Sequence, residues 1–300
     1  MSIGPVARLL RECRSIRRVL SAGDFRSLVA YVVRNAPEIV RTRKLSSVDI
    51  SMIRNLAIRY HDRRFLLPLA DIDALLAPHH DNPTFGNLRE MYANDSYLRS
   101  FRLKLPVATV LDLGANRGLF SLIAVMALDA KIVVGVKPLE FYEPIMRLLL
   151  DANGCAPSRV IRYNKFIGSP LTEQRNPGEY ISIESIREQQ RIARFGLVKM
   201  DIEGGELDIF GDPAWLSHVD NLTMELHHFA GNLDMIPHAL ERYGFPYVAT
   251  DQFGQACQFK DAMFLYASCA GALDEGGRPG ALPGSEQAEM NRLGQARAVR

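Results

Sequence analysis

Short runs of β-branched and other apolar residues alternate with helical patterns from about residue 105 onward. This alternation is typical of a parallel sheet whose strands are joined by crossover helices. Five strands are expected from it, at 107–113, 131–136, 159–163, 197–201 and 221–227. Two further runs, 246–250 and 262–267, are separated by only a short polar connection, which fits an antiparallel pair. We therefore predict an α/β fold with an open, doubly wound, mostly parallel sheet and an antiparallel terminal hairpin.

The first part of the chain has a helical pattern. Between Val6 and Leu20 apolar residues recur at helical spacing, and arginines fill much of the rest. A second helix is expected over 25–33 and a third over 50–60. Residues 1–65 contain 14 Lys and Arg but 5 Asp and Glu, so a net charge of +9 here is set against −7 in the remainder. The N-terminal part is therefore predicted to be a basic, helical extension.

These patterns predict the domain organisation. We expect a helical extension over 1–100, an α/β domain over 101–270 and a disordered tail over 271–300, where Gly and Pro are frequent and periodicity is lost. Apolar residues make up 47% of the chain and charged residues 23%, which excludes collagen-like and wholly disordered classes. The longest apolar run, 119–128, is about half of the ~20 residues that a membrane-spanning helix needs.

The cysteines and the basic N-terminus bear on location and partners. The four cysteines show neither a CxxC pair nor the spacing of zinc ligands, so we expect free thiols in a reducing, cytoplasmic compartment. The basic helix within 1–22 has two interpretations. It packs on the main domain with a solvated basic face, or it contacts an anionic membrane, to which each Lys or Arg contributes about 1 kcal/mol. An Arg-rich start also imitates an organelle transit peptide.

Candidate chemistry begins where the first strand of the sheet ends, in VLDLGANRGLFS. Asp112 lies at the carboxyl end of this strand, and Gly114 and Gly118 bracket the turn into a helix. Open α/β sheets bind ligands at this edge, where glycine permits a tight turn and the helix presents its N-terminal amides. A dinucleotide fingerprint needs glycine at the position of Asn116, so a closely bound pyrophosphate is disfavoured.

This stretch resembles the first motif of class I S-adenosylmethionine-dependent methyltransferases of the FkbM family. VKMDIEGGELDIF, over 198–210, resembles the acidic motif of the same family, about 85 residues further on. The similarity extends over roughly 87–267. It implies a Rossmann-like methyltransferase fold, S-adenosylmethionine as cofactor, and methyl transfer to an oxygen. The acceptor implied is a hydroxyl of a sugar, of a glycolipid or lipid-linked glycan, or of a secondary metabolite.

The resemblance also implies which residues bind the cofactor. Carried over position by position, these are Asp112, Gly114, Asn116, Gly118, Asp201 and Glu203. Asp201 ends a predicted strand at the binding edge, which favours a functional role. For Glu203 and Glu206 there is a structural alternative, because acids in the first turn of a helix are stabilised by its positive end.

One position departs from the family pattern. After the second strand the family has an acidic residue before a proline, and this carboxylate accepts both ribose hydroxyls, whereas this chain has Lys137. Three outcomes follow: Glu140 replaces the carboxylate and pairs with Lys137, the cofactor is bound weakly, or the protein is a catalytically silent, methyltransferase-like binding protein. A lysine here would also suit the 2′-phosphate of NADP, but Asn116 argues against that cofactor.

Methyl transfer to a hydroxyl requires alignment and often a base. His227 ends the fifth strand in MELHH, and it shares one face with Glu225 while His228 points away. We predict that His227 acts as base or positions the acceptor, with Asp201 nearby. A strand-end histidine that only packs is the alternative. The residues expected to contact the acceptor are Glu206, Glu225 and His227.

Two other kinds of partner are disfavoured. The ligand types of Asp201, Glu225 and His227 would suit a metal, but no spacing makes such a site specific, and no metal is predicted. Enzymes that methylate base amines resemble one another in an (Asp/Asn)-Pro-Pro-aromatic stretch after the fourth strand, where this chain has DIEGG. Nucleic acid is therefore not expected as a partner, and a hydroxyl-bearing small molecule or a glycan or lipid-linked acceptor is.

Overall fold

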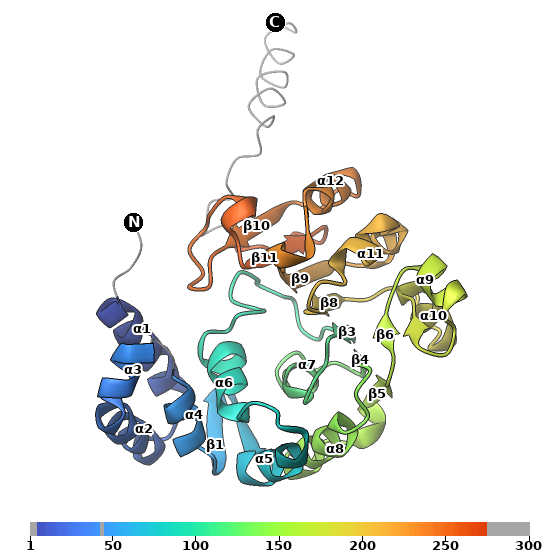
Figure 1. Ribbon diagram of the computed structural model, residues 1–300. Coiled ribbons are helices and arrows are strands. Elements are labelled where there is room, and N and C mark those ends of the chain that lie inside the picture. Colours follow the sequence, from blue (N-terminus) through green and yellow to red (C-terminus); the bar gives the residue numbers. More distant parts are fainter. Residues whose placement is uncertain (1–4, 43–44, 275–300) are drawn as a thin grey trace, which may run out of the picture.

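The computed structural model describes residues 5–42 and 45–274, and its centre is a seven-stranded sheet (Figure 1). The strand order is β10-β11-β9-β8-β3-β4-β5. The strands are β3 (Thr109–Leu113), β4 (Ile132–Val136), β5 (Val160–Tyr163), β8 (Leu197–Met200), β9 (Asn221–Glu225), β10 (Tyr247–Thr250) and β11 (Phe264–Ser268). Strands β3, β4, β5, β8 and β9 are parallel, and β11 is antiparallel to both of its neighbours. All seven predicted strands and the terminal antiparallel pair are confirmed.

Helices cover both faces of the sheet (Figure 1). Helices α7 (Leu119–Met126) and α8 (Tyr142–Ala152) lie on one face, and α10 (Ile183–Gln189), α11 (Glu206–Gly211) and α12 (Met235–Arg242) lie on the other. Two hydrophobic cores result: the first core lies on the side of α7 and α8, and the second core lies on the side of α10, α11 and α12. Successive strand residues point to opposite faces, so Val110 belongs to the first core and Leu111 to the second. The fold is therefore doubly wound, as predicted. The order of the strands reverses between β3 and β8, and ligands bind such sheets beside this switch point.

Smaller elements complete the chain. They are α1 (Pro5–Val19), α2 (Ala22–Arg34), α3 (Ala36–Thr42), α4 (Ser46–Ser51), β1 (Asn55–Tyr60), β2 (Arg63–Pro68), α5 (Leu69–Leu76), α6 (Thr84–Leu88), β6 (Phe166–Ile167), α9 (Pro170–Arg175) and β7 (Tyr180–Ile181). Short 3₁₀ segments lie at Ala77–His79, Pro157–Arg159, Pro213–His218, His228–Ala230 and Phe259–Asp261, and a π turn at Arg89–Ala93. Within the described part of the chain, no helix has both the length and the apolar character needed to cross a bilayer.

The first predicted helix packs on the body of the protein. Ile16, Val19 and Leu20 of this region are buried in the first core, and the guanidinium of Arg11 donates a hydrogen bond of 2.7 Å to the carbonyl of Phe253. This core also contains residues of the central sheet, so the extension and the sheet share one hydrophobic core. The predicted tail lies, beyond residue 274, outside the described residues.

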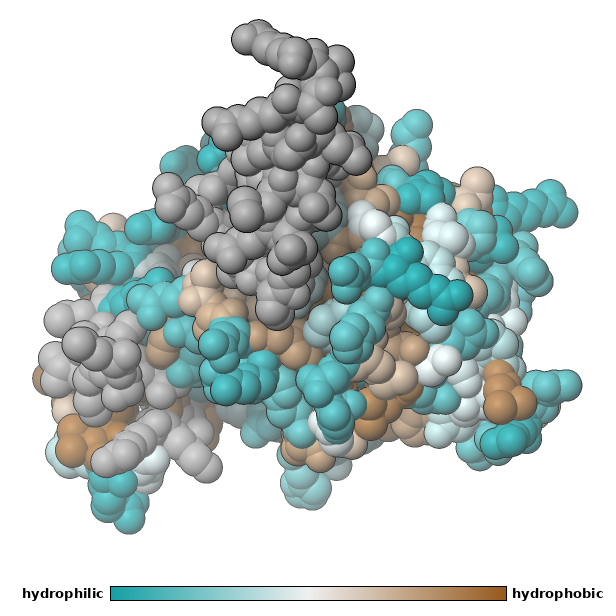
Figure 2. All heavy atoms as spheres, turned by 90° about the horizontal axis from the view of Figure 1, so that it is seen from above, coloured by the Kyte–Doolittle hydropathy of each residue, from teal (hydrophilic) through white to brown (hydrophobic). Residues whose placement is uncertain are grey.

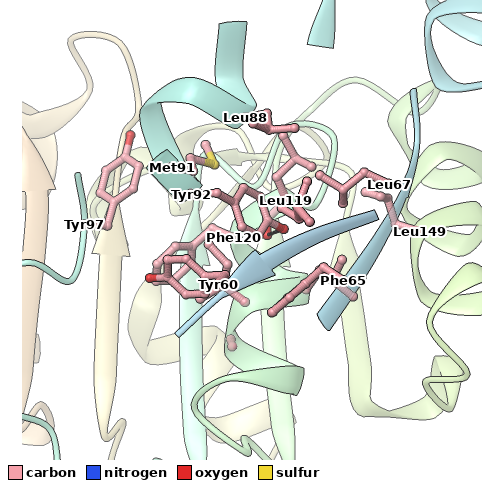
Figure 3. Close-up of a cluster of buried hydrophobic side chains, with 14 of the residues drawn as sticks. Tyr60, Phe65, Leu67, Leu88, Met91, Tyr92, Tyr97, Leu119, Phe120 and Leu149 are labelled. Atoms are coloured by element: carbon pink, nitrogen blue, oxygen red, sulfur yellow. Dashed lines mark hydrogen bonds between the residues drawn. The ribbon is translucent and has the colours of Figure 1, made fainter. Parts of the chain in front are cut away.

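The prediction of a third helix over 50–60 is wrong for most of this range. Helix α4 ends at Ser51, and β1 follows and pairs with β2 as an antiparallel hairpin. The buried residues of β1 are Leu56, Ile58 and Tyr60, which is the period of a strand. Figure 3 shows Tyr60 of β1 beside Phe65 of β2 and the aromatic side chains of Tyr92 and Phe120. Packing of this hairpin against the body decides in favour of the strand.

The surface seen in Figure 2 has hydrophobic areas lying between hydrophilic side chains. Arginines 14, 17 and 18 of α1 are exposed, which gives this helix the solvated basic face expected of a packed amphipathic helix.

Candidate functional site

The turn after β3 is pressed against the end of β8. The amides of Gly114 and Ala115 both donate hydrogen bonds of 3.0 Å to the carbonyl of Val136, which holds the turn across the end of β4. Gly114 has a φ of +77°, and a Cβ placed on it would lie 1.7 Å from the carbonyl oxygen of Asp201. Glycine is therefore required here both by its backbone conformation and by the space that the neighbouring chain leaves.

A buried ion pair lies beneath this turn. Asp112 and Lys199 are both completely buried, with 3.2 Å between Nζ and Oδ1. Lys199 also donates a hydrogen bond of 2.9 Å to the carbonyl of Gly114, and Ser121 donates one of 2.7 Å to the other oxygen of Asp112. Burial alone would lower the pKa of Lys199, but the charges of Asp112 and Asp201 outweigh it and raise the pKa. Lysine at this position keeps its charge and ties the turn to β8.

Sequence reasoning missed Lys199. The signal that could have found it is a lysine in the middle of the otherwise apolar strand β8, where every residue is buried. A buried lysine needs a carboxylate partner, and Asp112 lies on the neighbouring strand in register with it. The completely buried carboxylate of Asp112, predicted to line the cofactor pocket, contacts Lys199 and Ser121.

The predicted acceptor residues converge beyond the ends of β8 and β9. The Nε2 atom of His227 lies 3.8 Å from Oδ1 of Asp201, and its Nδ1 lies 2.7 Å from Oε1 of the completely buried Glu206. Glu225 belongs to the same group, since one ligand-type atom each of Asp201, Glu225 and His227 lie within 4.8 Å of one another. His228 points away as predicted, with Nε2 2.8 Å from the carbonyl of Ala262.

Tyr97, which sequence reasoning did not single out, joins this group from the segment before β3. Its hydroxyl lies 2.9 Å from Oδ2 of Asp201 and 3.4 Å from Oε2 of Glu225, and its single hydrogen can serve one of them at a time. Figure 3 shows Tyr97 to one side of the other aromatic residues of the first core. In the segment MYANDSYL, over 91–98, nothing in the sequence distinguishes Tyr97 from a tyrosine that only packs in the core.

Carboxyl groups are crowded at the strand ends. Burial, followed by the charge of Asp201, raises the pKa of Glu225 to about 8 and that of Glu90 to about 7. Burial opposes the charged form of His227, but the hydrogen bond and charge of Glu206 prevail, so the pKa of His227 is raised. Carboxylates brought this close favour protons or cations in their midst.

The lysine at the ribose position is paired across the crevice. Nζ of Lys137 lies 3.4 Å from Oε1 of Glu203, which follows β8 and is 67% exposed on its side chain. Glu140 is exposed, and the structure gives Lys137 the partner Glu203 instead. Of the three outcomes for this position, the one in which Glu140 pairs with Lys137 is therefore corrected, because Lys137 pairs with Glu203 and Glu140 is exposed to solvent.

A cavity of about 500 Å³ lies beside this pair. Gly114, Val136 and Lys137 bound one side of it, and Ile202, Glu203 and Gly205 bound another. The remaining lining comes mainly from the segment around β6 and β7, namely Lys165, Phe166, Ile167, Thr172 and Tyr180. Phe166 and Tyr180 are stacked with ring centroids 5.4 Å apart. The first motif, the acidic motif and residues 164–180 thus meet at one cavity.

Two features of the first motif suit a bound ligand. Asn116 has a φ of +46°, and its buried Oδ1 has no hydrogen-bond partner among the described residues. A buried acceptor without a donor costs roughly 1–3 kcal/mol, which a ligand N–H or O–H would recover. Gly118 also has positive φ, at +85°, and immediately precedes α7, so the helix begins at this turn.

Comparison with known proteins places these motifs in a family. Residues 112–247 match the methyltransferase FkbM domain. Among solved structures, the chain is similar to the methyltransferase FkbM from Methylobacillus flagellatus KT, with 18% identity over 78% of this chain and 70% of that chain and a TM-score of 0.40. No curated protein matches the sequence.

Two further solved structures are similar at low identity. One is a ribosomal protein L11 methylase from Lactobacillus delbrueckii subsp. bulgaricus, with 17% identity over 56% of this chain and 71% of that chain and a TM-score of 0.35. The other is a protein of the NADB-Rossmann superfamily from Streptococcus agalactiae, with 16% identity over 66% of this chain and 83% of that chain and a TM-score of 0.38. The family assignment rests on the match over residues 112–247, and the strand order of the sheet agrees with it. Residues 112–247 of this chain are a Rossmann-like methyltransferase domain of the FkbM family.

Proposed function

We propose that the protein is an S-adenosylmethionine-dependent O-methyltransferase that acts on a hydroxyl of a sugar, of a glycolipid or glycan, or of a secondary metabolite. The observation that carries this proposal is the meeting of His227, Asp201 and Glu206 at the same sheet edge as the glycine turn of the FkbM domain. When bound, the cofactor supplies an electrophilic methyl group. The chain has to bind it, orient an acceptor oxygen and take up the hydroxyl proton.

The residues at the cavity fit the cofactor in this proposal. Gly114 lines the cavity at the end of β3, and Asn116, two residues further along the same turn, has a buried Oδ1 with no hydrogen-bond partner among the described residues. Lys137 offers no acceptor for the ribose hydroxyls, but Glu203 places a carboxylate beside it from the opposite wall. Asp112 acts through Lys199 by holding the turn in place.

The acceptor proton is assigned to His227. Glu206 accepts a hydrogen bond from Nδ1 and thereby leaves Nε2 as the basic atom that faces Asp201. Glu225 completes the acceptor side of the proposed site. A hydroxyl acceptor needs such a base more than a neutral amine does, which is why oxygen is the proposed methyl acceptor.

Partners and location follow from the same proposal. The exposed ring of Phe166, stacked on Tyr180, offers an apolar platform beside polar groups, which suits a sugar or a small hydroxylated molecule. Helix α1 packs on the body through its apolar face, and its exposed arginines are still free to contact an anionic membrane, so peripheral membrane contact of residues 1–22 and a cytoplasmic location are part of the proposal. Binding to anionic vesicles that falls with salt and with the triple change of arginines 14, 17 and 18 to glutamine tests this contact.

The test of cofactor binding is calorimetric titration of S-adenosylmethionine and S-adenosylhomocysteine into the wild type, Lys137→Glu and Lys131→Glu. Lys131 is exposed and lies outside the cavity lining, so it controls for the change of charge. Micromolar binding by the wild type and by Lys131→Glu is expected, followed by formation of S-adenosylhomocysteine with a hydroxyl acceptor.

The second candidate function is a catalytically silent, methyltransferase-like binding protein, which Lys137 at the ribose position favours. It predicts that the wild type does not bind the cofactor and that affinity appears only in Lys137→Glu. That result would refute the enzymatic proposal. Product formation with any hydroxyl acceptor would refute the silent alternative.

A further inference from the structure

We propose that Asp201, Glu225 and His227 bind a divalent cation at the carboxyl ends of β8 and β9. The two strands are neighbours and parallel, with Met200 opposite Met224, so the residues that follow them emerge side by side. One ligand-type atom from each of the three residues lies within 4.8 Å of the other two. Nitrogen and oxygen ligands bound at about 2.1 Å to one ion lie roughly 3–4 Å apart. The spacing of 3.8 Å between Nε2 of His227 and Oδ1 of Asp201 is in this range. The limit of 4.8 Å for the whole set is longer than one ion spans, so the side chains would move closer together when an ion binds.

The imidazole is held as a metal-binding histidine is held. Glu206, which is completely buried, accepts a hydrogen bond of 2.7 Å from Nδ1 of His227. Ligating histidines nearly always donate their second N–H to such an outer carboxylate, which fixes the tautomer and the ring orientation. Nε2 then faces Oδ1 of Asp201 at 3.8 Å, which is too long for a hydrogen bond. A proton on Nε2 or a bound cation balances the carboxylate across this gap, and an ion that binds there displaces the proton.

The charges around this gap point the same way. Asp201, Glu206 and Glu225 converge there, and the Oε2 atom of the buried Glu206 has no hydrogen-bond partner among the described residues. Lys199 lies 3.6 Å from Oδ2 of Asp201, but it is closer to Asp112 and to the carbonyl of Gly114. The hydroxyl of Tyr97 also donates a hydrogen bond to Oδ2 of Asp201. Oδ1 of Asp201 and Nε2 of His227 therefore remain directed at the gap.

The ligand set selects the class of ion. One imidazole nitrogen with two carboxylates is a mixed set that suits Mn²⁺, Fe²⁺ or Zn²⁺ better than the all-oxygen set preferred by Mg²⁺ and Ca²⁺. Three protein ligands leave at least one coordination position open, which is the arrangement of a catalytic rather than a structural site. The open position would accept the acceptor oxygen and polarise its O–H bond. With the ion bound, Nε2 of His227 is a ligand and is not available as the base, so the ion would take over the activation of the hydroxyl that the proposed function assigns to His227. This role rests on the proposed function, whereas binding of the ion itself does not.

The sequence offers these three ligand types but no spacing that makes a metal site specific, because the ligands are not consecutive in the chain. Asp201 and Glu225 are separated by a whole crossover. Only the parallel pairing of β8 with β9 brings them together. The sequence-based expectation of no metal is therefore replaced by this proposal.

The test is direct titration of Mn²⁺ into the full-length protein after treatment with a chelator, in the absence of cofactor and acceptor. Loss of the electron paramagnetic resonance signal of free Mn²⁺ reports binding, and competition with Zn²⁺ and Mg²⁺ reports the class of ion. We expect one ion per chain. His227→Gln and Asp201→Asn should each weaken binding by at least tenfold, and Glu206→Gln by about 10–100-fold through loss of the outer-shell contact.

His228→Gln is the matched control, because His228 is adjacent in sequence but contacts the carbonyl of Ala262. It should bind Mn²⁺ like the wild type. Circular dichroism identifies any variant that fails to fold, and the conservative Asp201→Asn variant keeps the interpretation independent of His227. Absence of Mn²⁺ and Zn²⁺ binding by the wild type, or equal binding by all folded variants, would overturn the proposal. Because the ion is measured without cofactor, failure here is distinct from failure of the proposed function, which the S-adenosylmethionine titration tests separately.

Discussion

Lys199→Met should strongly destabilise the protein. Methionine matches the length of the lysine stem and packs well in an apolar strand, so the change chiefly removes the ammonium group. Asp112 then keeps a completely buried carboxylate with Ser121 as its remaining side-chain donor. Removing one partner of a buried ion pair typically costs about 3–5 kcal/mol, because the other charge is left uncompensated. This is a large fraction of the ~5–15 kcal/mol by which a domain is stable.

The double variant Asp112→Asn/Lys199→Met separates charge from packing. It removes both charges, and replacing a whole buried pair by neutral groups is often close to neutral in stability. We expect it to recover at least about 2 kcal/mol relative to the single variant. Ser121 remains able to donate its hydrogen bond to the amide oxygen of the asparagine.

Urea unfolding at neutral pH measures these differences. Trp215 is the sole tryptophan of the chain and is buried at 2% exposure in the second core, so its fluorescence reports unfolding of the methyltransferase domain. A loss of less than about 1 kcal/mol in Lys199→Met would refute the reasoning. So would a double variant that is no more stable than the single one, since the uncompensated charge would then not be the cause.

Three further predictions concern the turn, the first helix and a buried acid. Gly114→Ala should lower the unfolding free energy by more than about 4 kcal/mol or prevent folding, because the added Cβ would lie 1.7 Å from a backbone carbonyl oxygen. Gly154→Ala, at a glycine with positive φ but open space, should lower it by only about 1–2 kcal/mol, and equal losses would contradict this reasoning. Ile16→Ala should lower the unfolding free energy by about 2–5 kcal/mol while the exposed Arg17→Ala changes it by less than about 0.5; a silent Ile16→Ala would show that α1 does not pack as described. Burial raises the pKa of Asp95 from 3.8 to about 6. Between these two pKa values the folded state binds this proton and the unfolded chain does not, so the unfolding free energy of the wild type falls as pH rises. Asp95→Asn has no such proton, so its unfolding free energy should increase relative to that of the wild type by up to about 3 kcal/mol between about pH 4 and 7. A pH-independent difference between the two unfolding curves would count against it.

The arrangement of the central sheet could be predicted from sequence because its strands are short, β-branched and punctuated by helices. Strands β3, β4 and β8 are buried on both faces, so local hydrophobicity and tertiary position agree for them. The β1–β2 hairpin was not predicted, because the apolar residues at 50, 53, 56, 57 and 60 fit a helical period as well. Leu56, Ile58 and Tyr60 fit the period of a strand. Packing against the first core, which local sequence does not contain, chose between the two patterns.

The same division holds for the site. The sequence by itself determined the glycine turn, the acids of the second motif and the histidine at the strand end, because their chemistry is tied to chain direction at the carboxyl edge of a sheet. The tertiary structure alone decided the partners. Lys137 pairs with Glu203 instead of Glu140, Lys199 neutralises Asp112 beneath the turn, and Glu206 orients His227. Ion pairs and hydrogen bonds depend on separations of a few ångströms between atoms that are distant in the chain, and only the packing of β3, β8 and β9 sets those separations.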